Sequence, residues 1–182
     1  MTRASVAVGS LLIAALAAVS VVFAQQDDDD DDDAALGAEV MNAPISLGQG
    51  FTTSSREGVP ISGKFEIEKG SAQLSVYTAK NDAYAEVIVD HQSGRIAKVI
   101  PIVDGDDLVA AKEQMEAMRH AGLSLEQVTA SALKGAPGYR AVSVTPGRKD
   151  ASAGSRPLAR IVLTNGREVK TVYEPLEPGE KL

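Results

Sequence analysis

The sequence predicts an α+β protein made of two tandem units, each a helix followed by an antiparallel sheet. The units can share one sheet and are joined by a connector helix. Three observations predict this: residues 45–60 and 123–137 begin alike, the hydrophobic period then changes from helical to alternating, and turn signals separate the alternating segments. With no cysteine in 182 residues, a disulfide scaffold, a cysteine zinc site and a thiol nucleophile are excluded.

Residues 1–24 have the pattern of a signal peptide. Arg3 gives the positive start, an apolar stretch follows to Phe23, and the small residue Ala24 precedes the expected cut at Gln25. The alternatives are an uncleaved membrane anchor, because the run approaches the roughly 18–20 residues that span a bilayer, and a buried core helix. We expect cleavage and a periplasmic or secreted protein that contacts a membrane only if the segment stays uncleaved.

An acidic run, Asp27 to Asp33, lies in the expected disordered linker, residues 25–42. Without its seven aspartates the 25 acidic residues fall to 18, which equals the number of basic ones. Adjacent like charges repel each other and stay in water, which predicts an extended spacer. Binding of calcium or of a basic partner is the alternative, although calcium loops alternate their acidic ligands with spacers and a glycine.

The first unit, residues 43–103, begins with a helix signal. Ser46 and Gln49 have the spacing of a capping box, in which the serine accepts a backbone N–H bond and the glutamine reaches back. A helix of about three turns is expected to end at Gly58–Pro60. The alternating segments after it predict four strands, at about 61–68, 72–78, 83–90 and 95–103.

Residues 104–121 predict the connector helix. Asp106 or Asp107 can cap its start, and Gly122 is a natural stop after its end. Its apolar residues recur at helical spacing, so they are expected to pack in a core; they are Leu108, Ala111, Met115 and Met118.

The second unit, residues 122–182, repeats the pattern. Ser124 and Gln127 form the second capping box, and a helix is expected to end at Gly135–Gly138. Asn165-Gly166 predicts a type I′ turn, in which both turn residues need positive φ. The predicted strands lie at about 140–145, 158–164 and 167–174.

The first unit closes with Tyr84-Ala-Glu-Val-Ile-Val-Asp-His-Gln-Ser-Gly-Arg-Ile96. Together with the opening Ile-Ser-Leu-x-Gln helix, this segment resembles the PepSY domain. The motif residues that the resemblance marks as structural are Asp90, Ser93, Gly94 and Arg95, with Gly179 in the second unit. The second unit departs from the motif at Pro175, which stands for Asp90, and at Pro178. Its last strand is therefore expected to be absent or frayed.

The resemblance implies a small α+β unit with a helix on an antiparallel sheet, and a role in restraining peptidases outside the cytoplasm. The chain has no His-Glu-x-x-His of its own, so any inhibition acts on a separate protein. The resemblance therefore predicts a protein partner, with a peptidase as the candidate. Nucleic acid is not expected as a partner, since no cluster of lysine and arginine is present.

No catalytic residue and no cofactor are predicted. The Asp90 side chain is expected to stabilise a turn that also contains His91, and His120 is expected at a helix end. No Gly-x-Ser-x-Gly turn or phosphate-binding glycine loop occurs. The weak candidates for a cation site are Asp27, Asp33, Asp104, Asp106 and Asp107.

The function predicted from sequence is a non-catalytic exported binding module that regulates an envelope or secreted peptidase. A periplasmic sensor of a ligand or of a cation such as calcium is the alternative. An enzyme of unrecognised type is the third hypothesis, and it lacks any set of residues with suitable spacing.

Overall fold

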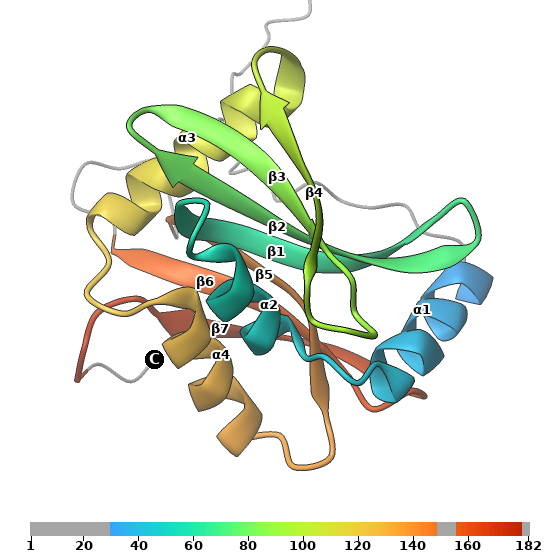
Figure 1. Cartoon of the computed structure of the whole chain (residues 1–182). Helices are drawn as coiled ribbons and strands as arrows, with labels where there is room; N and C mark the ends of the chain where they lie inside the picture. The colour runs from blue at the N-terminus through green and yellow to red at the C-terminus, as the bar shows by residue number, and fades with distance from the viewer. Residues whose placement is uncertain (1–29, 149–155, 180–182) are drawn as a thin grey trace, which may run out of the picture.

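The computed structural model describes residues 30–148 and 156–179. Within them lie four helices and one antiparallel sheet of seven strands, which confirms the predicted α+β class (Figure 1). The helices are α1 (Asp30–Asn42), α2 (Leu47–Ser54), α3 (Gly105–Arg119) and α4 (Leu125–Lys134). The strands are β1 (Val59–Glu68), β2 (Ser71–Lys80), β3 (Ala83–Val89), β4 (Ile96–Ile102), β5 (Arg140–Arg148), β6 (Pro157–Thr164) and β7 (Val169–Pro175).

The strand order in the sheet is β4-β3-β2-β1-β5-β6-β7. Each strand pairs antiparallel with the next one along the chain, except that β4 does not pair with β5; β5 pairs with β1 on one side and with β6 on the other. At this central contact Gly63 lies opposite Val144 and Lys64 lies opposite Ser143. Two runs of hairpins therefore extend outward from the middle of the sheet, and β4 and β7 are its edges (Figure 1).

Both central strands carry an irregularity in their pairing. In β1 the register with β2 shifts between Pro60 and Ser62, and in β5 the register with β6 shifts between Ala141 and Ser143. One extra residue is inserted at each point, as in a β-bulge, which bends a strand and increases its twist. The strong twist of the central strands is visible in Figure 1.

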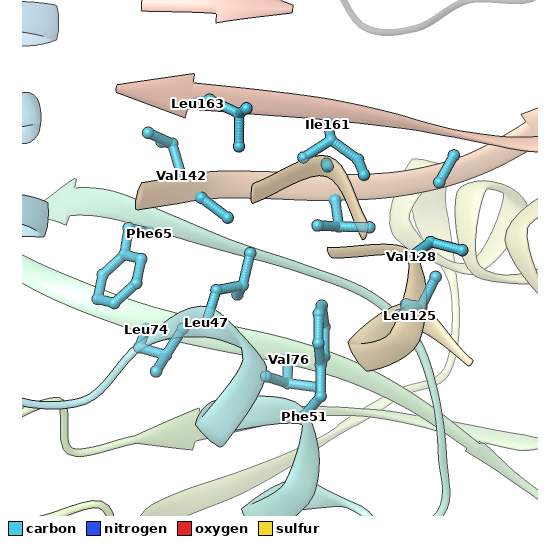
Figure 2. Close-up of a cluster of buried hydrophobic side chains, with 14 of the residues drawn as sticks. Leu47, Phe51, Phe65, Leu74, Val76, Leu125, Val128, Val142, Ile161 and Leu163 are labelled. Atoms are coloured by element: carbon cyan, nitrogen blue, oxygen red, sulfur yellow. The ribbon is translucent and has the colours of Figure 1, made fainter. Parts of the chain in front are cut away.

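One face of the sheet packs against α2 and α4. The predicted capping box is present at the start of both helices, at Ser46 with Gln49 and at Ser124 with Gln127. Both helices bury the same positions, counted from the first residue: Leu47, Gly50, Phe51 and Ser54 in α2, and Leu125, Val128, Thr129 and Ala132 in α4. Figure 2 shows the side chains of both helices meeting those of the sheet.

The opposite face packs against α3. Because successive residues of a strand point to opposite faces, Val76 joins the core beneath α2 while its neighbour Tyr77 packs in the α3 cluster. The predicted apolar stripe of this helix is confirmed. Its residues Leu108, Ala111, Met115 and Met118 pack with Ile61, Ala79 and Tyr84.

A helix replaces most of the expected linker, so the prediction of an extended segment is wrong for residues 30–42. Val40 is fully buried, and Arg140 donates hydrogen bonds to the carbonyl oxygens of Met41 (3.3 Å) and Ala43 (2.6 Å) just where α1 ends. Burial of one side and satisfaction of the carbonyls at its C-terminus stabilise this helix. Residues 25–29, like the predicted signal peptide, lie outside the described residues.

The predicted type I′ turn at Asn165 is also wrong, because Asn165 does not have positive φ. Its side-chain oxygen instead accepts N–H bonds from Arg167 (3.0 Å) and Glu168 (2.8 Å), which makes a longer loop. Two-residue turns with positive φ at both positions occur at Lys69-Gly70 and Asn81-Asp82.

Three further boundaries differ from the expectation. Helix α2 has eight residues, which is about two turns rather than three. The N-cap of α3 is Asp104 and not Asp106 or Asp107, and its side chain makes no capping hydrogen bond. Strand β7 is neither absent nor frayed, since it pairs with β6 as far as Pro175. In the described part of the chain, no helix has the length and apolarity needed to cross a membrane.

Candidate functional site

The motif residues after β3 form a turn closed by the side chain of Asp90. Its Oδ1 accepts the backbone N–H of Gln92 (2.8 Å) and of Ser93 (3.3 Å), and its Oδ2 accepts the Ser93 hydroxyl (2.7 Å). Gly94 has φ 71° and donates its N–H to the Asp90 carbonyl at 2.7 Å. Hydrogen bonds from the Ser93 hydroxyl and the Gln92 N–H lower the pKa of Asp90. The predicted turn-stabilising role of Asp90 is thus confirmed.

This turn lies against the beginning of α2. The Ile45 N–H donates to the carbonyl oxygen of His91 at 3.1 Å, and the Thr53 hydroxyl donates to that of Gly94 at 3.2 Å. A Cβ on Gly94 would come within 3.0 Å of the Ile45 side chain, so a glycine suits both the φ and the close approach. The His91 ring packs edge-on to Phe65, with the centroids 6.5 Å apart.

The end of β7 meets the start of α4 in a similar way with other residues. The Leu176 carbonyl accepts the N–H groups of Gly122 (2.8 Å) and Leu123 (2.9 Å). Gly122 packs against Pro178, where a Cβ would lie 2.7 Å from the proline ring, and Gly179 has φ 84°. Both turns therefore hold, through backbone hydrogen bonds, the segment that leads into a helix. The polar groups of Asp90 and Ser93 form hydrogen bonds inside their own turn. Arg95 takes part through its backbone and is exposed at the surface.

The acidic candidates for a cation site are not gathered by the fold. Asp104 caps α3, and Asp106 and Asp107 lie in its first turn. Among the described residues, no group of three or more histidine, aspartate or glutamate side chains could hold a metal ion. Asp27 and the side chain of Asp33 lie outside the described part.

His120 is the C-cap of α3, which confirms its predicted position at a helix end. Its Nε2 lies 3.2 Å from Glu116, which also faces Arg119 (3.7 Å) and Arg148 (3.5 Å). Arg119 reaches Asp82 at 3.3 Å on the β2–β3 turn. These contacts are exposed, so each stabilises the fold by at most about 1 kcal/mol. They tie α3 to the sheet.

Sequence reasoning missed a polar cluster on the α3 side of the sheet. The buried Ser75 hydroxyl lies 3.0 Å from a carboxylate oxygen of Glu66 and 2.8 Å from one of Glu86. The Gln73 amide donates to Ser75 at 3.0 Å, and Lys64 pairs with Glu66. The alternation of polar residues along three neighbouring strands was the available signal, but only the register brings these side chains together.

Burial raises the pKa of the nearby Tyr77, and the carboxylates Glu86 and Glu66 raise it further. Its phenol therefore stays protonated across the physiological range. The Ser75 hydroxyl has one proton, so it donates to Glu86 or to Glu66, and the Gln73 amide also donates to Glu66 at 3.4 Å.

An open depression of about 560 Å³ lies where α2 ends. Apolar groups from distant segments line it, including Val59, Pro60, Tyr84 and Met115, and Arg56 and Lys80 lie among the other lining residues. Val59 is 54% exposed although it is apolar. Sequence analysis could not find this hollow, because its lining comes from β1, β2, β3 and α3.

Comparisons with protein-family models, with curated proteins and with solved structures found no match for this chain.

Proposed function

We propose that this chain is an exported, non-catalytic binding module made of two PepSY-like units, and that it regulates an envelope or secreted peptidase. The observation that carries the proposal is the internal use of the motif: Asp90, Ser93 and Gly94 bond to one another and hold the turn on α2. The best-patterned polar residues thus serve the scaffold. A partner would therefore bind to the surface of the module and not to these motif residues.

The pairing register supports two related units. Val76 pairs with Val87, and 85 residues later Ile161 pairs with Val172. The same spacing superimposes the sequence Val87 to Gly94 on Val172 to Gly179, an alignment made from the sequence alone. Two independent routes therefore give one correspondence between the halves.

Hydrogen bonds at the helix starts support the same correspondence. Ile45, just before the first capping box, donates to His91, and Leu123, just before the second, donates to Leu176. His91 and Leu176 are also 85 residues apart. A duplicated unit explains why the same hydrogen bond, from the N–H before a capping box to a carbonyl just after a strand, occurs twice.

The surface that fits a protein partner best is the depression beside Val59. Binding sites are typically concave, mostly apolar and edged by a few polar groups. This hollow has an apolar lining from Pro60, Tyr84 and Met115, with Arg56 and Lys80 beside it. An apolar side chain of a peptidase can fill it without any bond being made or broken.

Inhibition assays test this proposal. The exported chain, titrated into envelope and secreted peptidases, is expected to slow cleavage of a peptide substrate in a saturable manner. Val59→Asp should weaken the effect, because a carboxylate in the apolar hollow must be desolvated on contact. Val109→Asp is the matched control, since Val109 is equally exposed, at 56%, but lies on α3 outside the lining.

Unchanged cleavage at saturating concentrations by every peptidase tested would count against regulation. Inhibition that Val59→Asp and Val109→Asp affect equally would remove the depression as the contact. Cell fractionation with N-terminal sequencing tests the export part separately. A chain that begins at Gln25 in the periplasm or medium is the expected result, and a cytoplasmic chain with Met1 intact would contradict it.

A further inference from the structure

The outer edge of β7 presents backbone groups away from the sheet. The Asn165 N–H donates to Glu168 at 3.2 Å and the Leu176 N–H donates to Pro157 at 3.1 Å. Because hydrogen-bonded residues alternate along an antiparallel pair, even-numbered residues of β7 bond to β6. The N–H and C=O of Val169 and Thr171 therefore point outward, where no described strand pairs with them.

A second copy of the same strand matches this edge in charge. In an antiparallel pairing about Val172, Lys170 lies opposite Glu174 of the other copy, and twofold symmetry repeats that pair. Opposite charges placed directly across two strands stabilise the pairing. The side chains of Lys170, Val172 and Glu174 share one face of the sheet, so each pair meets on the same side.

Other registers lose this match. An antiparallel pairing about Thr171 would put Glu168 opposite Glu174, and like charges directly opposite destabilise a sheet. Pairing about Tyr173 would put Lys170 opposite Leu176. In a register offset by one residue, the residues whose backbone groups point outward would lie opposite residues whose backbone groups already bond to β6. No hydrogen bonds could then form between the two copies. Among the registers centred on Thr171, Val172 and Tyr173, only the one about Val172 combines backbone alignment with attraction.

The other edge of the sheet lacks this property. Strand β4 carries Lys98 and no acidic residue, so self-pairing brings no opposite charges together. It also contains Pro101, which has no N–H to donate. Lysine and proline are the residues that protect edge strands from unwanted pairing. In β7 the single proline, Pro175, is the last residue of the strand.

We infer that two copies of this chain associate by antiparallel pairing of their β7 strands about Val172, which joins their sheets into one. The inference does not depend on the proposed function, because no residue of β7 lines the depression beside Val59. The association is expected to be weak and reversible, since seven residues from each copy make a small interface.

Sedimentation velocity across a concentration series tests the inference. The full chain, produced so that export and processing occur normally, is expected to shift reversibly from monomer to dimer as its concentration rises. Glu174→Lys should weaken the dimer by about tenfold or more, because both symmetric pairs change from attractive to repulsive. Lys170→Glu should do the same. The double variant K170E/E174K exchanges the charges and should restore the dimer.

The rescue separates pairing from a structural effect. Lys170 also lies over the Tyr139 ring, 4.2 Å from its centre, so Lys170→Glu alone can lower stability, whereas Glu174→Lys leaves that contact in place. Lys98→Glu on β4 is the control and should leave the dimer unchanged. A chain that stays monomeric into the millimolar range, a dimer insensitive to both single variants, or a double variant without rescue would each overturn the inference.

Discussion

On each side of the sheet's centre a helix packs on antiparallel strands, α2 with β1–β4 and α4 with β5–β7, but different residues fill the space between helix and strands. The first half has Phe51 above Gly63, whereas the second has Thr129 at the matching helix position and Val144 opposite Gly63 in the sheet. The large side chain comes from the helix in the first half and from the strand in the second. A close-packed interior fixes total volume more strictly than it fixes which element supplies that volume.

The turn after β3 and the turn after β7 also have similar roles but different residues. The first half closes its turn with the Asp90 carboxylate, and the second has Pro175 at the corresponding place and a proline-rich segment after it. In both, a backbone carbonyl of the turn holds the residue before a capping box. A pre-set φ in one half and side-chain hydrogen bonds in the other restrict the chain equally well.

Removal of the aromatic ring should separate the halves most strongly. Phe51→Ala is expected to lower the free energy of unfolding by about 3–5 kcal/mol, because the ring is 2% exposed and a cavity remains. Thr129→Ala at the corresponding position of α4 should cost about 2 kcal/mol, since it loses the hydrogen bond to the Leu125 carbonyl and one buried methyl group. Denaturant unfolding measures both, and equal losses would contradict the difference in packing.

Gly63 should tolerate no side chain while Phe51 is present. A Cβ there would lie 2.7 Å from Cε1 of Phe51, so Gly63→Ala is expected to destabilise the fold by about 1–3 kcal/mol. In a Phe51→Leu background the same change should cost less, because the clashing ring is gone. The four unfolding free energies form a double-mutant cycle, and purely additive values would show that the ring does not require the glycine.

The capping boxes should contribute alike in the two halves. Ser46→Ala and Ser124→Ala each remove the acceptor for one backbone N–H, at 3.3 Å and 3.2 Å, and should each cost about 1 kcal/mol. Aspartate at either position also caps helices, so Ser46→Asp and Ser124→Asp should keep most of the stability. A large loss in one half only would show that the other helix is held by packing alone.

The smallest effect concerns the turn with the carboxylate. The pKa of Asp90 lies below its ordinary value of about 3.8, so its ionised form stabilises the folded state above that pH. This contribution is lost as the pH falls through the lowered pKa. Asp90→Asn should therefore reduce the acid sensitivity of the unfolding midpoint between pH 6 and pH 2. Identical pH profiles for the two proteins would show that the turn does not depend on the charge.

Local patterns predicted much of this fold. Alternating residues placed the seven strands close to their observed bounds, although the prolines of the second unit wrongly predicted an absent or frayed last strand. Ser-x-x-Gln placed the starts of α2 and α4. Gly94, which the family resemblance marks as structural, has positive φ. Each of these features depends on residues a few positions apart, so the sequence pattern contains the whole cause.

Most of the failures involve residues held from elsewhere in the fold, and one involves a local side-chain bond. Helix α1 was missed because burial of Val40 and the bonds from Arg140 stabilise it from outside its own segment. The Asn165 turn was misassigned because the asparagine side chain bonds within a longer loop. The Ser75 cluster and the depression beside Val59 each gather residues from several strands.

The sequence by itself determined the positions of the strands, the starts of α2 and α4 and which faces are apolar, because those properties arise from neighbouring residues. Only the tertiary structure decided that β1 meets β5 in the middle of the sheet and that β4 and β7 become its edges. Pairing between distant strands depends on which surfaces bury each other, and that choice is made by the whole chain at once.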